Sequence, residues 1–300
     1  MHTVASEQAG LTVAALVREL SPGLSWSQAR ELCRGGKVWV DGAAAFDPAR
    51  RLAGGERVEI RSGGGRSAAI ELVVHLDPDV AVVRKPAGIL TVPFERQDRD
   101  TLLALARVAI RRMESARGLP PNPTLRAVQR LDKETSGLVV FARTLHAQRH
   151  LQEQLAEHTV TRRYLAIAHG KVEDSTHDSL LVPDRGDGLR GSWNRRGSPP
   201  ATARQAVTYV RVKQRLSGAT LVTCELETGR QHQIRIHLAE AGHPLVGETV
   251  YIRDYRGPVL PAPRPMLHAT VLGFRHPRGD RPMQFEDPMP ADFLQVLERL

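Results

Sequence analysis

The chain has few cysteines, few aromatic residues and no long apolar run. It contains 2 cysteines among 300 residues, and aromatic residues make up 4% of it. Cys33 and Cys224 lie so far apart that they predict neither a disulfide framework nor a cysteine-ligated metal site. No stretch approaches the roughly 18 apolar residues of a membrane span, and the N-terminus lacks the charged-then-apolar order of a signal peptide. We therefore expect a cytoplasmic protein that does not enter a membrane.

Positive charge, in contrast, is abundant. The formal net charge is +9, and most of the cations are arginines. Clustered arginine and lysine gain affinity for phosphate backbones through counterion release, which makes nucleic acid the first candidate partner. A genome biased towards arginine codons would leave the same composition. The hydrophobic content of 41% is enough for a globular protein with a sizeable core.

The N-terminal part predicts a small module at residues 11–61, after a flexible tail at 1–10. A helical stripe ends at Ser21, and a second helix begins after Ser25 and stops at Gly35. Two short strands follow at 37–40 and 57–60, with a turn after the first. The order resembles the alpha-L RNA-binding module of a ribosomal small-subunit protein, and the alternative is a helix–strand adaptor without a ligand. The resemblance implies RNA contacts from the basic residues of the second helix and the following strand, namely Arg30, Arg34 and Lys37.

A Gly/Ser-rich linker at 62–69 separates this module from a larger domain at 70–300. The linker is no phosphate-binding loop, since no Gly-Lys-Ser/Thr follows it. Beyond it, we expect helices capped by Asp100 and Thr144 and strands at 70–75, 80–83, 138–142, 164–168, 206–212 and 220–226. These strands follow one another without regular crossover helices, so we predict an α+β fold with a mixed, mostly antiparallel sheet.

The most site-like stretch is 130–143. A polar cluster precedes the apolar run 138–142, which predicts a buried strand that would hold the cluster rigidly. Asp132 lies between Arg130 and Lys133, whose charges favour its ionised form. The alternative is a solvated loop before a core strand.

A second dense segment spans 227–238. Here Arg230, His232 and Gln233 are expected where a strand ends, and Arg235 begins the next turn, held by the alternating apolar side chains around it. His232, His237 and His243 also suggest metal ligands. We expect no metal, because the neighbouring arginines would repel a cation and the spacing fits no standard zinc pattern.

A basic, glycine-rich loop at 184–200 carries Trp193. Such a loop can clamp RNA and stack on a splayed base, or it can be a solvated insertion. The candidate contacts in it are Arg190, Arg195 and Arg196.

Taken together, these motifs resemble the RluA-type pseudouridine synthases. The family motif His-Arg-Leu-Asp-x-x-Thr-Ser-Gly matches 129–137 except at its first position, which is Gln129 here. A basic residue before a tyrosine and a strand matches Arg163 and Tyr164, and Gly-Arg-x-His-Gln-Ile/Leu-Arg-x-His matches 229–237. We expect the Gln129 side chain to replace the usual histidine in packing and hydrogen bonding. Glu248 stands where aspartate is more usual.

The resemblance implies isomerisation of uridine in RNA to pseudouridine, without a cofactor. Asp132 would be the catalytic carboxylate, Arg235 its basic partner and Tyr164 the ring that packs on the uracil. Arg130 would fill the space left by a flipped nucleotide. The remaining substrate-binding residues would be Leu131, Thr135, Arg230, His232 and Gln233.

The RNA target follows less directly. The alpha-L module is common in relatives that act on large-subunit ribosomal RNA, which we favour. The alternatives are a transfer RNA target, or a catalytically silent RNA-binding or ribosome-assembly factor on the same scaffold. We expect a monomer, since no exposed apolar helix requires a partner.

Overall fold

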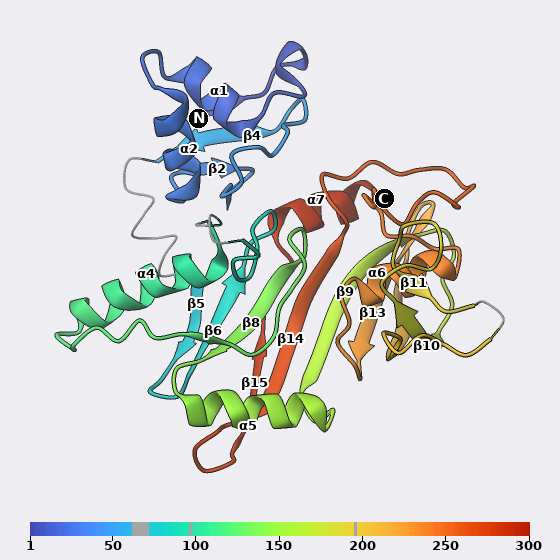
Figure 1. Cartoon of the computed structure of the whole chain (residues 1–300). Helices are drawn as coiled ribbons and strands as arrows, with labels where there is room; N and C mark the ends of the chain where they lie inside the picture. Colours follow the sequence, from blue (N-terminus) through green and yellow to red (C-terminus); the bar gives the residue numbers. More distant parts are fainter. Residues whose placement is uncertain (62–71, 96–97, 99, 195–196) are drawn as a thin grey trace. The chain divides into compact units, whose positions relative to one another are not determined.

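The computed structural model describes residues 1–61, 72–95, 98, 100–194 and 197–300 (Figure 1). The chain forms two compact units: Met1–Leu151 with Met289–Leu294, and Gln152–Pro288 with Gln295–Leu300. The predicted linker at 62–69 lies outside the described residues. Within the described ranges, no helix is long and apolar enough to cross a membrane.

The first unit begins with two helices and a small sheet. Helices α1 (Val13–Leu20) and α2 (Trp26–Arg34) are capped by the Thr12 and Ser25 hydroxyls, which accept from the backbone N–H groups of Ala15 and Gln28. The sheet has the order β1-β4-β2-β3. Its strands are β1 (His2–Thr3), β2 (Val38–Val40), β3 (Ala43–Ala44) and β4 (Arg57–Ile60). These elements agree with those predicted for the module.

The tail prediction for 1–10 is wrong in its first residues. Strand β1 pairs antiparallel with β4, and Val4 is 2% exposed in the core beside Val13 and Leu52. A short 3-10 helix, η1 (Ser6–Gln8), follows. Two paired residues and one buried valine give no periodicity that a sequence pattern can detect.

The remainder of the first unit is a helix and an antiparallel sheet. Strand β6 (Val80–Lys85) lies between β5 (Val73–Leu76) and β8 (Ser136–Ala142), and β7 (Arg126–Ala127) pairs with β8. Every residue of β8 is buried, as its apolar run predicts. Helix α4 (Leu102–Ala116) is capped by Thr101, not by the predicted Asp100. Thr144 caps α5 (Leu145–Ala156), as predicted.

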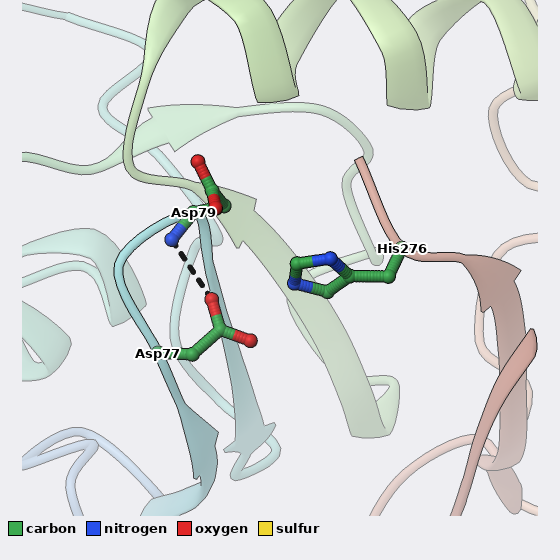
Figure 2. A group of neighbouring side chains, drawn as sticks. All are labelled: Asp77, Asp79 and His276. Atoms are coloured by element: carbon green, nitrogen blue, oxygen red, sulfur yellow. Dashed lines mark hydrogen bonds between the residues drawn. The ribbon is translucent and has the colours of Figure 1, made fainter. Parts of the chain in front are cut away.

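An aspartate forms the turn between β5 and β6. Asp77 Oδ1 accepts from the backbone N–H groups of Asp79 and Val80, both at 2.8 Å, and Figure 2 shows the first of these bonds. Asp77 Oδ2 lies 2.6 Å from His75 Nε2. This arrangement closes a tight turn and fixes the start of β6.

The second unit is a meandering antiparallel sheet of order β11-β10-β12-β13-β9-β14, with β15 on β14. The strands are β9 (Thr161–His169), β10 (Ser175–Val182), β11 (Gly191–Ser192), β12 (Arg204–Arg215), β13 (Ala219–Leu226), β14 (Leu267–Arg275) and β15 (Pro282–Glu286). Helix α6 (Gln233–Glu240) packs beside β11 and β12 (Figure 1), and α7 (Ala291–Arg299) ends the chain. The predicted α+β fold with a mostly antiparallel sheet is confirmed.

Helix α6 replaces the alternation that the sequence suggests for 233–238. All six of these residues are buried, the polar ones as well as the apolar ones. A helix enclosed on all sides has no polar face, so its sequence shows no period of 3.6 residues. The helix begins after His232, which adopts a left-handed conformation with φ 60°.

Candidate active site

A buried lysine holds the turn that carries Asp132. Lys85, at the end of β6, is 1% exposed. Its Nζ donates to the backbone carbonyls of Pro86 (3.1 Å), Lys133 (2.7 Å) and Thr135 (2.8 Å). Since an ammonium has three protons, these carbonyls use all of them. Lys85 thereby fixes the backbone on the C-terminal side of Asp132.

Thr91 fixes the other side of the same turn. Its hydroxyl donates to the Leu131 carbonyl and accepts from the Leu131 N–H, both at 3.0 Å. The Thr135 N–H closes the turn on the Asp132 carbonyl at 3.1 Å. Asp132 itself is half-buried. Because Lys85 and Thr91 fix the backbone on either side of it, the position of its carboxylate is defined by the turn.

The predicted neighbours of Asp132 divide into two kinds. Arg130 is exposed and makes no hydrogen bond with the described residues, so its guanidinium remains available. Leu131 and Thr135 are 9% and 4% exposed and have a structural role in the turn, and their predicted substrate contact stays a prediction. Gln129 is half-buried, and the structure shows no side-chain hydrogen bond from it to any described residue. The hydrogen-bonding role expected for it is therefore absent here.

The three bonds of Lys85 predict that its loss lowers both stability and activity, which the sequence alone did not suggest. Lys85→Met would leave three carbonyls without their donor, which should lower the free energy of unfolding by about 3 kcal/mol. Displacement of Asp132 should lower kcat on RNA at least about tenfold. Denaturant unfolding and pseudouridine formation measure the two effects. Lys171→Met is the control, because the Lys171 side chain is 80% exposed; equal stability of the two variants would contradict the bracing role.

In the second unit, Gln233 braces the segment before α6. Its Oε1 accepts from the Thr228 hydroxyl (2.8 Å) and the Arg230 N–H (2.9 Å). Its Nε2 donates to the Val207 carbonyl and the Thr208 hydroxyl, both at 2.9 Å. Gln233 is 2% exposed and its amide uses all its hydrogen-bonding capacity, which gives it a structural role; its predicted substrate contact stays a prediction.

Arg162 explains the glycine of this segment. Its Nη2 donates to the Glu227 carbonyl at 2.6 Å, and a Cβ at position 229 would clash with its Nη1. Burial lowers the pKa of Arg162. Gly229 therefore lets a buried guanidinium pass directly beside the backbone.

The three histidines considered as metal ligands each bond to a different protein group. His232 Nδ1 lies 2.7 Å from the Tyr251 hydroxyl, and His243 Nδ1 lies 2.9 Å from the His169 carbonyl. His237 lies between the hydroxyls of Thr208 (2.9 Å) and Ser179 (3.0 Å). Burial lowers the pKa of His237 to about 4. His237 is thus a neutral interior residue at physiological pH.

Arg235 forms a two-pronged ion pair with Glu248. Arg235 Nε lies 2.8 Å from Glu248 Oε2, and Nη2 lies 2.7 Å from Oε1. Oε1 also accepts from the backbone N–H groups of Thr249 and Val250 at 3.0 and 2.9 Å. The Glu248 side chain is 0% exposed. Burial opposes its ionisation, but the hydrogen bonds and charge of Arg235 and the backbone N–H groups of Val250 and Tyr251 bring its pKa below the ordinary value.

Tyr164 and Tyr251 complete the described geometry. Tyr164 lies on β9 with 8% exposure, paired in register with Cys224 on β13 and Ala269 on β14. The Arg235 guanidinium lies 5.3 Å from the centre of the Tyr251 ring. Tyr164 and Arg235 belong to the second unit and Asp132 to the first. Sequence reasoning missed Glu248 as the partner of Arg235, although a lone buried carboxylate near a buried arginine is the expected compensation.

The predicted RNA contacts of the N-terminal module lie on and after α2. Arg30 and Arg34 are exposed, and Lys37 is half-buried. Arg230 is exposed, with its Nε bonded to the Gln205 carbonyl at 2.8 Å. Arg190 is half-buried, whereas Arg195 and Arg196 lie outside the described residues.

Comparison with known proteins decides the family. The family model described as RNA pseudouridylate synthase matches residues 79–240. The chain belongs to the RNA pseudouridylate synthase family. This synthase also contains an S4 domain at 13–58, which agrees with the module predicted at 11–61.

Curated relatives match the synthase over most of their length. One from Nitrosomonas europaea, named "Ribosomal large subunit pseudouridine synthase D", is 34% identical over 99% of this chain and 87% of its own. A relative of the same name from Neisseria meningitidis serogroup A is 36% identical over 99% of this chain and 81% of its own. "Uncharacterized RNA pseudouridine synthase YlyB" of Bacillus subtilis is 36% identical over 76% of this chain and 72% of its own.

Solved structures agree on the fold. Human RNA Pseudouridylate Synthase Domain Containing 4 superposes with a TM-score of 0.61 at 22% identity, covering 78% of this chain and 96% of that one. Human RNA Pseudouridylate Synthase Domain Containing 1 gives 0.54 at 24% identity, covering 72% and 82%. The fold of the synthase is therefore that of pseudouridine synthases.

Proposed function

We propose that this synthase converts uridine to pseudouridine in large-subunit ribosomal RNA. The observation that carries the proposal is the similarity, over 99% of the chain, to relatives named as ribosomal large subunit pseudouridine synthases. The S4 domain and the net charge of +9 support an RNA substrate. The enzyme acts as a monomer in the cytoplasm, without a metal or cofactor.

The reaction is an isomerisation that balances within the nucleotide. The bond from ribose C1′ to uracil N1 breaks, the base turns, and C1′ bonds to C5. C5 loses a proton and N1 gains one, so there is no net oxidation. Asp132 serves as the carboxylate beside the sugar, either as nucleophile or as base. The support is its place in a turn fixed by Lys85 and Thr91.

The second unit supplies the residues proposed to contact the uracil and to orient Asp132. Tyr164 packs on the uracil, and Arg235 stabilises and directs the Asp132 carboxylate. Glu248 and the Tyr251 ring hold Arg235 in one orientation. Arg130 fills the gap left by the flipped uridine. Contacts with the surrounding RNA come from Arg230, His232 and Arg190, and the S4 domain contributes Arg30, Arg34 and Lys37.

Mapping pseudouridine at nucleotide resolution tests the target. Total RNA from a wild-type strain and from a deletion strain is compared, and at least one site in large-subunit ribosomal RNA should disappear. Expression of the wild-type chain should restore it, and the Asp132→Asn chain should not. A missing site in transfer RNA alone would contradict the proposed target, and no missing site in any RNA would favour a silent binding factor.

A further inference from the structure

The second unit contains a cavity of about 650 Å³ beside α6. Its apolar lining comes from Ile236 and Ala239 on α6 and from Val250, and its aromatic lining from Tyr251 and Tyr255. Figure 1 shows α6 beside β10 and β11, which the loop of Arg185 connects. The volume lies within the roughly 300–1,000 Å³ of small-ligand sites. The cavity is therefore large enough for one nucleotide.

Two cations at the cavity have no partner within the described part of the chain. Arg253 and Arg256 line it, both are exposed, and neither makes a hydrogen bond or ion pair with a described residue. Free guanidinium groups beside an apolar and aromatic surface suit a phosphate attached to a planar base.

The acidic groups of the lining are already engaged. Asp254 lies 3.2 Å from Arg185 Nη2, which also binds Asp187 at 2.9 Å. Glu240 lies 3.8 Å from Arg185 Nη1 and accepts from the Ser192 N–H (2.8 Å) and hydroxyl (2.5 Å). All three carboxylates thus face Arg185, and Arg253 and Arg256 are the guanidinium groups of the lining that have no acidic partner among the described residues.

The loop that walls the cavity is fixed to α6. Besides the bonds of Ser192 to Glu240, a Cβ at position 191 would clash with the Arg185 side chain, so the glycine permits close packing there. The two hydrogen bonds from Ser192 to Glu240 fix this wall before a ligand arrives, which lowers the entropic cost of binding.

We propose that this cavity binds one nucleotide of the substrate RNA other than the target uridine. Its phosphate contacts Arg253 and Arg256, and its base packs on Tyr255 and the apolar lining. The proposal rests on the proposed function for the identity of the RNA. Neither Tyr164 nor Arg235 lines the cavity, so it is not the place assigned to the target uridine. Tyr251 connects the two places, since its ring lies beside Arg235 and its hydroxyl bonds to His232.

The first test removes the two free charges. The wild type, the Arg253→Gln/Arg256→Gln protein and the Lys213→Gln/Arg281→Gln protein are titrated with an unmodified large-subunit ribosomal RNA transcript at several salt concentrations. Lys213 and Arg281 are exposed, do not line the cavity, and remove the same charge. The cavity variant should raise Kd and KM at least about tenfold and reduce the salt slope by about 1 to 2. Equal effects of both double variants would overturn the proposal.

A second variant tests the base-binding part without changing charge. Ala239→Phe should fill the apolar floor and raise Kd at least about fivefold while the salt slope stays unchanged. Thermal unfolding confirms that the variant is folded. A folded Ala239→Phe protein with wild-type affinity would show that the floor does not receive a base, against the proposal.

Binding of uridine 5′-monophosphate tests whether the cavity takes a free nucleotide or a nucleotide of the substrate RNA. Saturable binding of it that the Arg253→Gln/Arg256→Gln change removes, with RNA affinity equal to the control variant, would assign the cavity to a free nucleotide and overturn the RNA assignment. The Kd comparison does not depend on turnover. A wild type that binds the transcript but forms no pseudouridine would therefore contradict the proposed target, whereas the effect of the cavity variants would still decide the cavity.

Discussion

Asp132→Asn is expected to bind RNA and form no detectable pseudouridine. Asparagine keeps the shape of the side chain, and the turn is held through backbone groups by Lys85 and Thr91. The loss should be at least about 10³-fold in kcat, which corresponds to about 4 kcal/mol of transition-state stabilisation. Conversion of uridine in the large-subunit transcript and a parallel RNA titration measure the two properties.

A matched control for this variant lies in the same turn. Glu134→Gln removes the same charge two residues away, and Glu134 is half-buried like Asp132. The Glu134→Gln protein should bind RNA as tightly as the wild type and should still form measurable pseudouridine. Full activity of Asp132→Asn, or an equal loss in Glu134→Gln, would remove Asp132 from the chemistry.

Glu248→Gln should be strongly destabilising. It removes the carboxylate charge that pairs with the Arg235 guanidinium, whose side chain is 8% exposed. Breaking a buried ion pair from one side costs about 3–5 kcal/mol, and the remaining amide oxygen places the expected loss near 3 kcal/mol. Denaturant unfolding at neutral pH measures it, and turnover on RNA should fall with the loss of Arg235 orientation.

The stability lost in Glu248→Gln should depend on pH. Because the folded-state pKa of Glu248 lies below its ordinary value of 4.5, its ionisation stabilises the fold above that pH and the contribution is lost as the pH falls through the folded pKa. The difference between wild type and Glu248→Gln should therefore be greatest at neutral pH and shrink below about pH 4.5. A constant difference across this range would contradict the charge-based cause.

Two control variants show whether the loss of stability comes from breaking the ion pair in a buried position. Asp280→Asn breaks the Arg275–Asp280 pair, which has the same 2.8 Å separation but is 55% and 60% exposed; this change should cost less than about 1 kcal/mol. The double change Arg235→Met/Glu248→Met should recover most of the stability, since an apolar pair can replace a buried ion pair. Stability of the double variant no better than that of Glu248→Gln would point to lost packing instead.

The sequence predicted elements with a clear local signal. The run 138–142 lies inside β8, and the helices of the module follow from the apolar stripe of the first and the Ser25 cap of the second. It did not predict α6, because every residue from Gln233 to Leu238 is buried and tertiary packing decides the conformation. Strands β14 and β15 were also not predicted.

The same distinction applies to the candidate site. Asp132 could be singled out because a charged cluster meets a buried strand within a few residues. Lys85 and Glu248 could not, because their partners lie 48 and 13 residues away in the chain, at Lys133 and Arg235. The structural role of Gln233 could not be predicted for the same reason, since its bonds to Val207 and Thr208 form only in the folded sheet.

The close passage of Arg162 beside Gly229 also constrains how this chain can change over generations. A larger residue at 229 requires the Arg162 guanidinium to move, whereas a shorter residue at 162 would free the space. The residues at 162 and 229 are therefore expected to change together in related chains.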